Sequence, residues 1–252
     1  MKKYQIFILL GFVWASSANG KVFDYGKQSL STYLKGSLGM TMLQKTAYQT
    51  GFQPTVLFNG NDGVNTAYSG EAGLAFTSPR NFTLRLGVEL FYPSLTKDLD
   101  GADSSGNKLL TITSQVYAVI PQVNLEFFVK QGAKYHYYIG GGAGYAITTL
   151  KNTVTISSAS VGVSDFIEEG SGWALMGQGY AGVEFAFFDS VGFSFDAGYR
   201  YLFVDNYKSN RDSVTPTGTY YKGNQIKNYD GTNRATNLSG PWVSGTFRIY
   251  FN

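Results

Sequence analysis

Ten titratable side chains recur at alternate positions within apolar stretches of this chain of 252 residues, and their types suit ion pairing or acid–base chemistry. They are Lys35, Glu71, Arg85, Glu89, Glu126, His136, Glu184, Asp196, Arg200 and Arg248. Lysine and arginine beside carboxylates form charge-assisted hydrogen bonds, whereas histidine beside a carboxylate can move a proton. Which chemistry applies depends on the elements that hold these groups and on whether solvent reaches them.

Strict alternation of apolar and polar residues, typical of β-strands with two unlike faces, indicates what those elements are. Between Val191 and Phe203 the odd positions are apolar or aromatic, and a similar pattern returns between Val243 and Phe251. The alternation predicts eight strands, at roughly residues 32–44, 69–78, 82–93, 110–128, 135–147, 173–188, 191–204 and 240–251. The fourth changes parity near Tyr117 to Val119, where we expect a β-bulge.

The connections between these strands alternate in length. Long, polar loops are predicted at 45–68, 94–109, 148–172 and 205–239, and short turns at 79–81, 129–134 and 189–190. All long loops therefore fall at one end of the sheet and all short turns at the other. Residues 155–160, within the third of these long loops, are a candidate extension of the flanking hairpin beyond the main sheet.

Composition and the N-terminal segment narrow the class of protein. The net charge of +3 is too small for a general nucleic-acid binder, and zero cysteines exclude disulfides and thiolate sites. Lys2 and Lys3 precede a short apolar run and small residues, as in a secretory signal peptide over residues 1–20, with cleavage after Ala18 or Gly20. Residues 21–31 are then a periplasmic N-terminal segment, and 32–252 form the folded domain.

The apolar faces are long and rich in aromatic residues, and the sequence predicts no helix to cover them. If these faces meet lipid, every backbone polar group must be paired within the sheet, which leaves a closed barrel. We therefore predict an all-β fold, an eight-stranded antiparallel up-and-down transmembrane β-barrel. Aromatic residues near strand ends are expected to form interfacial girdles; they are Phe127, Phe187, Phe193, Trp242 and Phe251. A soluble sandwich or lipocalin-like barrel is the alternative, because parity does not say which face is inside.

In a barrel of this size the polar faces fill the interior, so the ten charged groups are expected to pair as an ionic plug. Counting across the turns places Glu184 roughly opposite Asp196, with Arg248 as the nearby cation. It also places Glu71 opposite Glu89, with Arg200 or Lys35 at a similar height. A conductive or gating role for this network is the alternative.

Three motifs suggest chemistry that we do not predict. His136 falls opposite Glu126 near a short turn, and we expect a hydrogen-bonded pair rather than a catalytic dyad. The glycine run 140–144 lacks the lysine and helix of a phosphate loop, so we expect it to make room for bulky neighbours. The run 98–103 lacks the glycine and glutamate of a calcium loop, so we expect a solvated acidic loop. We therefore predict no catalytic, cofactor-binding or metal-binding residues.

The leader, the alternation, the loop asymmetry and the terminal run Phe247-Arg248-Ile249-Tyr250-Phe251 resemble the small outer-membrane β-barrel proteins of Gram-negative bacteria. This superfamily includes the OmpA transmembrane domain, OmpW and the Opa and Ail adhesins. The resemblance implies that Phe247, Ile249 and Phe251 are an assembly signal for the barrel-assembly machinery, although Asn252 follows them. It also implies a location in the outer membrane, with lipid and lipopolysaccharide as neighbours.

The expected role is structural or surface-interacting, with host or extracellular ligands contacting the loops. The alternative is a narrow, OmpW-like channel for small or hydrophobic solutes. A lipid-modifying enzyme is third, because known outer-membrane barrel enzymes place their catalytic residues toward the outer rim and His136 falls at the opposite end.

Overall fold

The computed structural model describes residues 29–42, 52, 56–59, 65–93, 99–132, 135–158, 161–162, 164–188, 190–215 and 218–251. The predicted leader and both cleavage positions lie outside this part of the chain. The main strands are β1 (Ser29–Thr41), β3 (Asn65–Ser78), β4 (Phe82–Pro93), β6 (Lys108–Gln131), β7 (Tyr135–Ile156), β8 (Phe166–Phe188), β9 (Val191–Val204) and β14 (Gly240–Phe251). Within the described ranges, no helix has the length and apolar character needed to cross a membrane.

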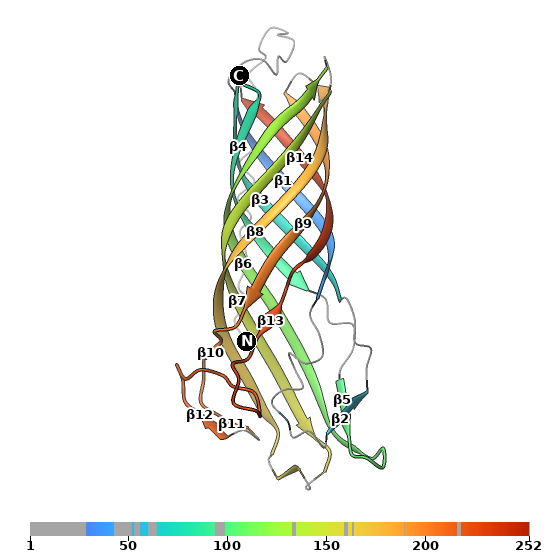
Figure 1. Ribbon diagram of the computed structural model, residues 1–252, viewed down its shortest axis with the longest axis vertical. Coiled ribbons are helices and arrows are strands. Elements are labelled where there is room, and N and C mark those ends of the chain that lie inside the picture. The colour runs from blue at the N-terminus through green and yellow to red at the C-terminus, as the bar shows by residue number, and fades with distance from the viewer. Residues whose placement is uncertain are drawn as a thin grey trace, which may run out of the picture.

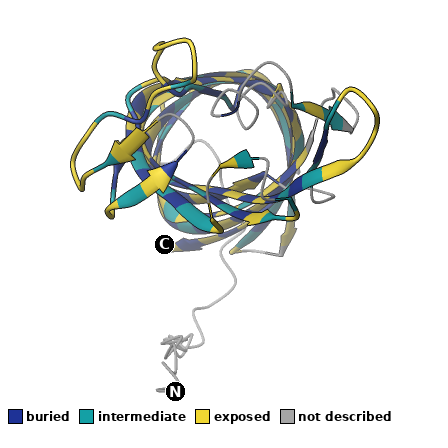
Figure 2. Ribbon diagram, turned by 90° about the horizontal axis from the view of Figure 1, so that it is seen from below, coloured by how far each residue is buried: buried dark blue, intermediate teal, exposed yellow. Residues whose placement is uncertain are grey.

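These eight strands close into a ring, which confirms the predicted fold class. Each strand pairs with its neighbours in antiparallel register, and β1 pairs with both β3 and β14. Successive paired residues run once round the ring through Ser29, Thr77, Thr83, Glu126, Gly140, Tyr180, Gly198, Trp242 and Gly39. The path returns to β1 ten residues further along, from Ser29 to Gly39, so the strands are strongly tilted. Figure 1 shows this tilt, and Figure 2 shows the ring seen along the barrel.

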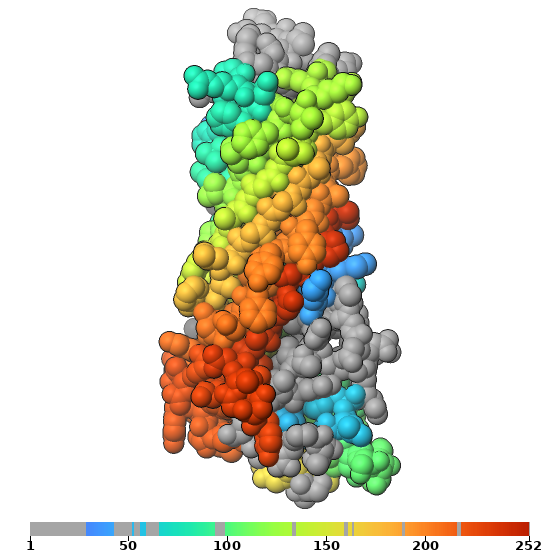
Figure 3. Space-filling view, in the orientation of Figure 1, coloured from blue at the N-terminus to red at the C-terminus, as the bar shows by residue number. Residues whose placement is uncertain are grey.

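The alternation of faces sets what lies inside. On β14, Ser244, Thr246 and Arg248 are buried, whereas Val243 and Phe247 are 57% and 43% exposed. The other seven strands follow the same rule over the half of the barrel nearer the short turns, so the apolar faces look outward there. In Figure 3 the strands β7, β8 and β9 cross one face of the molecule diagonally, and their outward side chains form its surface. The soluble alternative required the opposite orientation and is excluded.

Strands reach further into the predicted long loops than the sequence indicated. The predicted loop 148–172 is mostly strand, because β7 continues to Ile156 and β8 begins at Phe166. In loop 94–109, β5 (Leu99–Ala102) pairs with the early start of β6. In loop 45–68, β2 (Leu57–Asn59) pairs with β5, and β3 already begins at Asn65. These extensions continue the barrel wall past the ends of β1, β9 and β14 (Figure 1).

The fourth predicted loop, 205–239, contains the short strands β10 (Lys208–Ser209), β11 (Ser213–Thr215), β12 (Gly218–Tyr220) and β13 (Thr236–Asn237). At the other end of the barrel, Ser29 to Ser31 already belong to β1, so the predicted periplasmic segment 21–31 is too long. Its remaining residues, 21–28, are outside the described part of the chain.

The predicted bulge near Tyr117 to Val119 is wrong. The pairing of β6 with β4 and β7 keeps one register through this region, and the shift occurs instead between Phe128 and Lys130. The change in the sequence pattern has another cause: Val116, Ala118 and Ile120 are apolar and point inward. The strand keeps its period of two while its interior neighbours change from polar to apolar.

Aromatic side chains form the outer surface near both ends of the apolar wall. Toward the short turns these are mainly phenylalanines, including Phe127 and Phe187, which are 51% and 65% exposed. Toward the long loops they are mainly tyrosine and tryptophan; exposed members are Tyr68, Tyr92, Tyr117, Tyr145, Trp173, Tyr199 and Tyr201. Such girdles fit the two interfaces of a bilayer. Trp242 does not belong to them, because it points into the barrel and is buried.

Candidate functional site

The candidate site is the barrel interior, where every one of the ten predicted charged groups is buried. Inward-facing positions on all eight strands hold them, and none is more than 5% exposed. We call this group, together with the buried tyrosines and amides that contact it, the ionic layer. It occupies the half of the lumen nearer the short turns. Burial of so many charges is stable only when they are paired and hydrogen-bonded.

Three acids and two arginines are linked at the short-turn end of the ionic layer. Arg85 Nη1 lies 2.7 Å from Glu126 Oε1. Arg248 bridges two acids, with Nη2 at 3.2 Å from Glu126 and Nη1 at 2.9 Å from Glu184 Oε2. Arg85 Nη2 also lies 3.5 Å from Glu71, and the hydroxyl of Tyr33 donates to the same carboxylate at 2.5 Å.

A second part of the ionic layer lies nearer the middle of the lumen. Glu71 and Glu89 are directly opposite on β3 and β4, and each has a cation of its own. Lys35 Nζ lies 3.5 Å from Glu71 Oε2, and Arg200 Nη2 lies 2.5 Å from Glu89 Oε1. Lys35 Nζ also lies 4.0 Å above the ring of Trp242, a cation–π contact that explains why this tryptophan is inside.

Asp196 has different neighbours from those predicted. It pairs across β8 with Gly182, whereas Glu184 pairs with Ser194, because a register shift near Ala186 moves the ladder. The Asp196 carboxylate accepts hydrogen bonds from the hydroxyls of Tyr138, Ser244 and Thr246. The expected acid pair is therefore not formed, and hydroxyl donors satisfy Asp196.

His136 is also placed differently from the prediction. It lies opposite Glu184, with Nε2 at 3.5 Å from Oε2, while Glu126 faces Gly140 on the same strand. β6 continues to Gln131, which is the residue opposite His136, so the turn is shorter than predicted and the count across it changes. The imidazole is fully buried, with its ring centroid 4.3 Å from that of Phe128. Such an enclosed ring can support packing and pairing but cannot reach a substrate in solution.

Inward glycines make room for the large members of the ionic layer. A Cβ on Gly142 would lie 1.9 Å from Asn124 Oδ1, and a Cβ on Gly140 would lie 2.6 Å from the ring of Tyr180. Similarly, a Cβ on Gly87 would lie 2.2 Å from the hydroxyl of Tyr33. The glycine run predicted to accommodate bulky neighbours does so.

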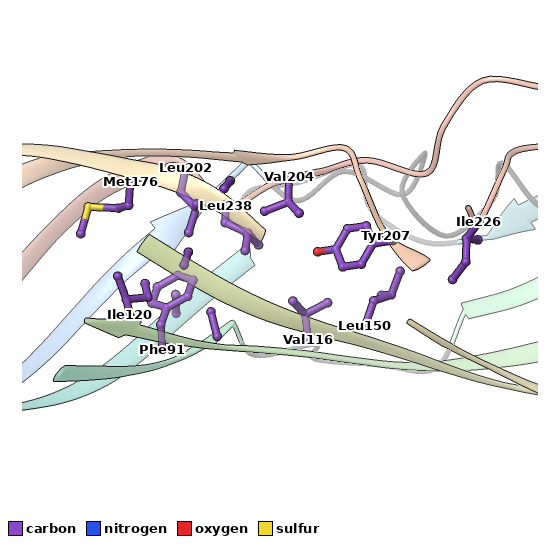
Figure 4. Packing of buried hydrophobic residues seen from close by; sticks show 14 residues of the cluster. Phe91, Val116, Ile120, Leu150, Met176, Leu202, Val204, Tyr207, Ile226 and Leu238 are labelled. Atoms are coloured by element: carbon purple, nitrogen blue, oxygen red, sulfur yellow. The ribbon is translucent and has the colours of Figure 1, made fainter. Parts of the chain in front are cut away.

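The sequence interpretation missed a second, apolar layer in the lumen, between the ionic layer and the long loops. Its buried members are Ala67, Phe91, Val116, Ala118, Ile120, Ala146, Leu150, Ala174, Met176, Leu202, Val204, Tyr207, Ile226 and Leu238. Figure 4 shows its larger side chains pointing toward one another from different strands and from the 205–239 segment. We call this set the apolar plug. The signal for it was the parity change in β6, which marks where the inward residues become apolar.

A buried ion pair on the long-loop side was also missed. Arg234 Nη1 lies 2.7 Å from Glu168 Oε1, and its Nε donates to Asn228 Oδ1 at 2.8 Å. Both charged side chains are nearly inaccessible, and the pair fastens the 205–239 segment to the inward face of β8. No local pattern indicates this contact, because the two residues are 66 positions apart in the chain.

The acidic side chains of the segment 98–103 that the structure describes stabilise the local turn and strand pairing. Asp103 Oδ1 accepts the backbone N–H groups of Ser105 and Asn107, both at 2.9 Å. The side-chain and backbone hydrogen bonds from Asn107 hold the pKa of Asp103 below its ordinary value. Asp100 accepts from Thr111 and pairs with Lys108 at 2.7 Å. Asp98 lies outside the described residues, and among those described no group of three metal-ligating acids and histidines is present.

Comparison with known proteins gives likeness of fold only. No protein-family model and no curated protein matches the chain. Among solved structures, Neisserial surface protein A matches at 14% identity and a TM-score of 0.46, covering 88% of this chain and 97% of that one. Ail, the attachment invasion locus protein of Yersinia pestis, matches at 12% identity and a TM-score of 0.44, with coverage of 88% and 99%.

A major outer membrane protein from Thermus thermophilus matches at 9% identity and a TM-score of 0.49, again covering 88% of this chain and 99% of that one. The chain resembles small outer-membrane β-barrels. The barrel assignment itself rests on the strand pairings described above.

The predicted assembly signal lies on the outer wall. Phe247, Ile249 and Phe251 are all outward on β14, and Phe251 pairs with Leu30 at the start of β1. Their side chains are 39% to 43% exposed, so they are accessible from the lipid side. Recognition by an assembly machinery stays a prediction.

Proposed function

We propose that this protein is a sealed outer-membrane scaffold whose work is done by its extracellular surface, as a structural or adhesin-like contact protein. The observation that carries this proposal is the double filling of the lumen. The ionic layer occupies one half, and the apolar plug occupies the other. An eight-stranded barrel is just wide enough for side chains to fill, and this one is filled along its described length.

A cavity at the junction of the ionic layer and the apolar plug is small. The cavity beside Arg200, lined on its inner side by Phe91, Leu238 and Trp242, has a volume of about 10 Å³. This volume counts only the positions open to the centre of a water molecule, and on that measure about 10–15 Å³ holds one water molecule, so the cavity has room for about one water and not for a column. An ion crossing the apolar plug would lose its hydration without gaining polar partners. These features disfavour the channel alternative.

The extracellular part, by contrast, is built as an ordered platform. A second apolar cluster lies beyond the membrane level, where Leu110, Ile112 and Val154 pack with Phe52. The Arg234–Glu168 pair fastens the 205–239 segment beside it. Large apolar side chains remain exposed there, including Tyr221 at 62% and Val214 at 61%. Exposed aromatic residues on a rigid support are typical of contact surfaces.

Conductance in planar bilayers tests the sealed scaffold. We expect no ohmic steps from the folded protein across a range of voltages, because the apolar plug blocks the lumen. The control is a variant in which Leu202→Ser and Ile120→Ser place polar groups in the plug. Steps from the unaltered protein that change in size with Arg200→Ala would support the narrow channel instead.

Cell adhesion tests the contact role. The hairpin of β11 and β12 is exposed at Val214, Gly218 and Thr219 and lies outside the eight barrel strands, so its replacement by a short Gly-Ser turn leaves those strands intact. Cells carrying this variant should bind extracellular matrix or host cells less than cells carrying the unaltered chain. Equal binding at equal surface amounts would contradict a contact role for this segment.

An enzymatic role has less support in the described geometry. The single histidine is enclosed between Phe128 and Tyr138 in the short-turn half of the lumen. A general base must come within hydrogen-bond reach of its substrate, and the lumen around His136 leaves no access for a lipid.

A further inference from the structure

One hollow on the lipid-facing wall has an aromatic upper edge. A hollow of about 670 Å³ crosses β3, β4, β6, β7 and β8, with almost entirely apolar lining. Its outward side chains include Leu74, Val88, Val123, Ala143 and Leu175. It exists because Ala143 and Pro121 are small beside the larger side chains around them. We call it the β6–β8 hollow.

The upper edge of the β6–β8 hollow, toward the long loops, is an aromatic platform. Tyr145 lines the hollow and stacks against Trp173, with ring centroids 5.6 Å apart and an interplanar angle of 20°. The two side chains remain 42% and 54% exposed despite this contact. A stacked, exposed pair offers a flat face at the level of the bilayer interface.

Polar groups follow directly above this platform. Ser171 is the next outward residue of β8, and Asn210 Nδ2 donates to its hydroxyl at 2.8 Å. Lys208 on β10 pairs in register with Ser171 and is exposed. The acidic groups near this level are Glu169, which lies opposite Lys151, and Asp205. One face therefore presents apolar, aromatic, hydroxyl and cationic groups in vertical order.

This order matches the parts of one kind of molecule. We propose that the β6–β8 hollow and its upper edge bind a glycolipid of the outer leaflet, the class of acylated and phosphorylated sugars. An acyl chain occupies the hollow, a sugar ring packs its C–H groups on the negative face of the Tyr145–Trp173 pair, and a phosphate accepts a hydrogen bond from Lys208. The inference rests on the proposed outer-membrane location.

A second hollow on the wall supplies the contrast. It has a volume of about 660 Å³ and is lined mainly by outward residues of β1, β7, β8, β9 and β14, including Ala181, Ala197 and Gly245. No residue of its lining stacks against a tryptophan as Tyr145 does in the β6–β8 hollow. We expect ordinary phospholipid chains to cover it, so it serves as the internal control.

Native mass spectrometry of the folded full chain in detergent tests this site, with hexa-acylated diphosphoryl lipid A as the added lipid and phosphatidylglycerol as the competitor. The unaltered protein should retain lipid A at about tenfold lower concentration than phosphatidylglycerol. Ala143→Phe, which fills the hollow, and Trp173→Ala, which removes half of the platform, should each raise the required concentration by about tenfold. Ala181→Phe in the second hollow should not.

Trp173 is exposed, so its replacement keeps the test valid even where Ala143→Phe does not fold. Equal retention of the two lipids by the unaltered protein would overturn the proposal. So would equal lipid A retention by the Trp173→Ala and Ala181→Phe variants. The conductance measurement tests the sealed lumen independently of lipid binding. A negative result for the lipid site would therefore not contradict the scaffold proposal.

Discussion

At the scale of single residues, the ionic layer is held by arginines that each serve more than one acid. Arg248 contacts Glu126 and Glu184, and Arg85 contacts Glu126 and Glu71. Removing one such cation deprives two buried carboxylates of one charged partner each, whereas removing an exposed arginine changes no buried contact. The balance of charge inside the barrel, rather than any one pair, keeps the lumen stable.

Arg248→Ala should destabilise the barrel by about 3–5 kcal/mol, the usual cost of removing one partner of a buried ion pair. The measurement is the urea midpoint of unfolding in detergent, read by strand circular dichroism. Arg80→Ala is the control, because Arg80 is exposed at a short turn and its replacement should change stability by less than about 0.5 kcal/mol. An Arg248→Ala midpoint equal to that of Arg80→Ala would rule out the ion-pair account.

Gly142→Ala should destabilise the barrel by about 1–3 kcal/mol, because its methyl group would overlap sterically with the Asn124 side chain. Gly179→Ala is the matched control, since a Cβ there meets nothing within 4 Å on the outer wall. Equal stability of the two variants, measured by the same denaturation, would show that the glycine run is not needed for packing.

At the scale of the element, strand ends were predictable on one side of the barrel and not on the other. The bounds of β4, β9 and β14 match the sequence prediction, because their apolar faces meet lipid along the whole strand. Above the membrane the pattern inverts. On β7, Leu150 and Val154 are inward and buried, while Thr149 and Lys151 are outward. A search for outward apolar residues therefore ends β3, β6, β7 and β8 too early on the long-loop side.

The segment 205–239 depends on contacts that no local pattern reveals. Tyr207 and Ile226 are buried in the apolar plug, and Arg234 is paired with Glu168 on β8. These are long-range tertiary contacts, so the sequence predicted a loop where the structure has a fastened cap. The same burial raises the pKa of the Tyr207 phenol above its ordinary value, and the group stays neutral.

Arg234→Ala should release this cap while the barrel stays folded, because Glu168 loses its partner outside the membrane-spanning part. Limited proteolysis of the protein in liposomes should then cut within 205–239 about tenfold faster than in the unaltered chain, as expected when local opening becomes easier by about 1.4 kcal/mol. Arg211→Ala, an exposed arginine in the same segment, is the control. Unchanged cleavage in the Arg234→Ala variant would mean that the pair does not fasten the cap.

At the scale of the whole molecule, apolar side chains face outward across the membrane, whereas beyond the membrane they face inward, as in a soluble protein. Lipid covers the apolar wall, and the interior changes from the ionic layer to the apolar plug toward the outside. The sequence predicted the barrel and the ten charged residues of the ionic layer from alternation, and it predicted the outward orientation of the apolar faces from their length and aromatic content. The apolar plug, the partners of His136 and Asp196, and the cap depend on register shifts and distant contacts.

The most direct test of the account is a single-cysteine scan of β14, which the absence of native cysteines makes possible. Val243→Cys and Phe247→Cys should carry spin labels that collide freely with oxygen, as groups in hydrocarbon do. Ser244→Cys and Thr246→Cys change little in size and should resist a charged, water-soluble maleimide in the folded barrel. Rapid labelling at Ser244→Cys or Thr246→Cys, or water exposure at Val243→Cys and Phe247→Cys, would contradict a lipid-facing wall around a sealed interior.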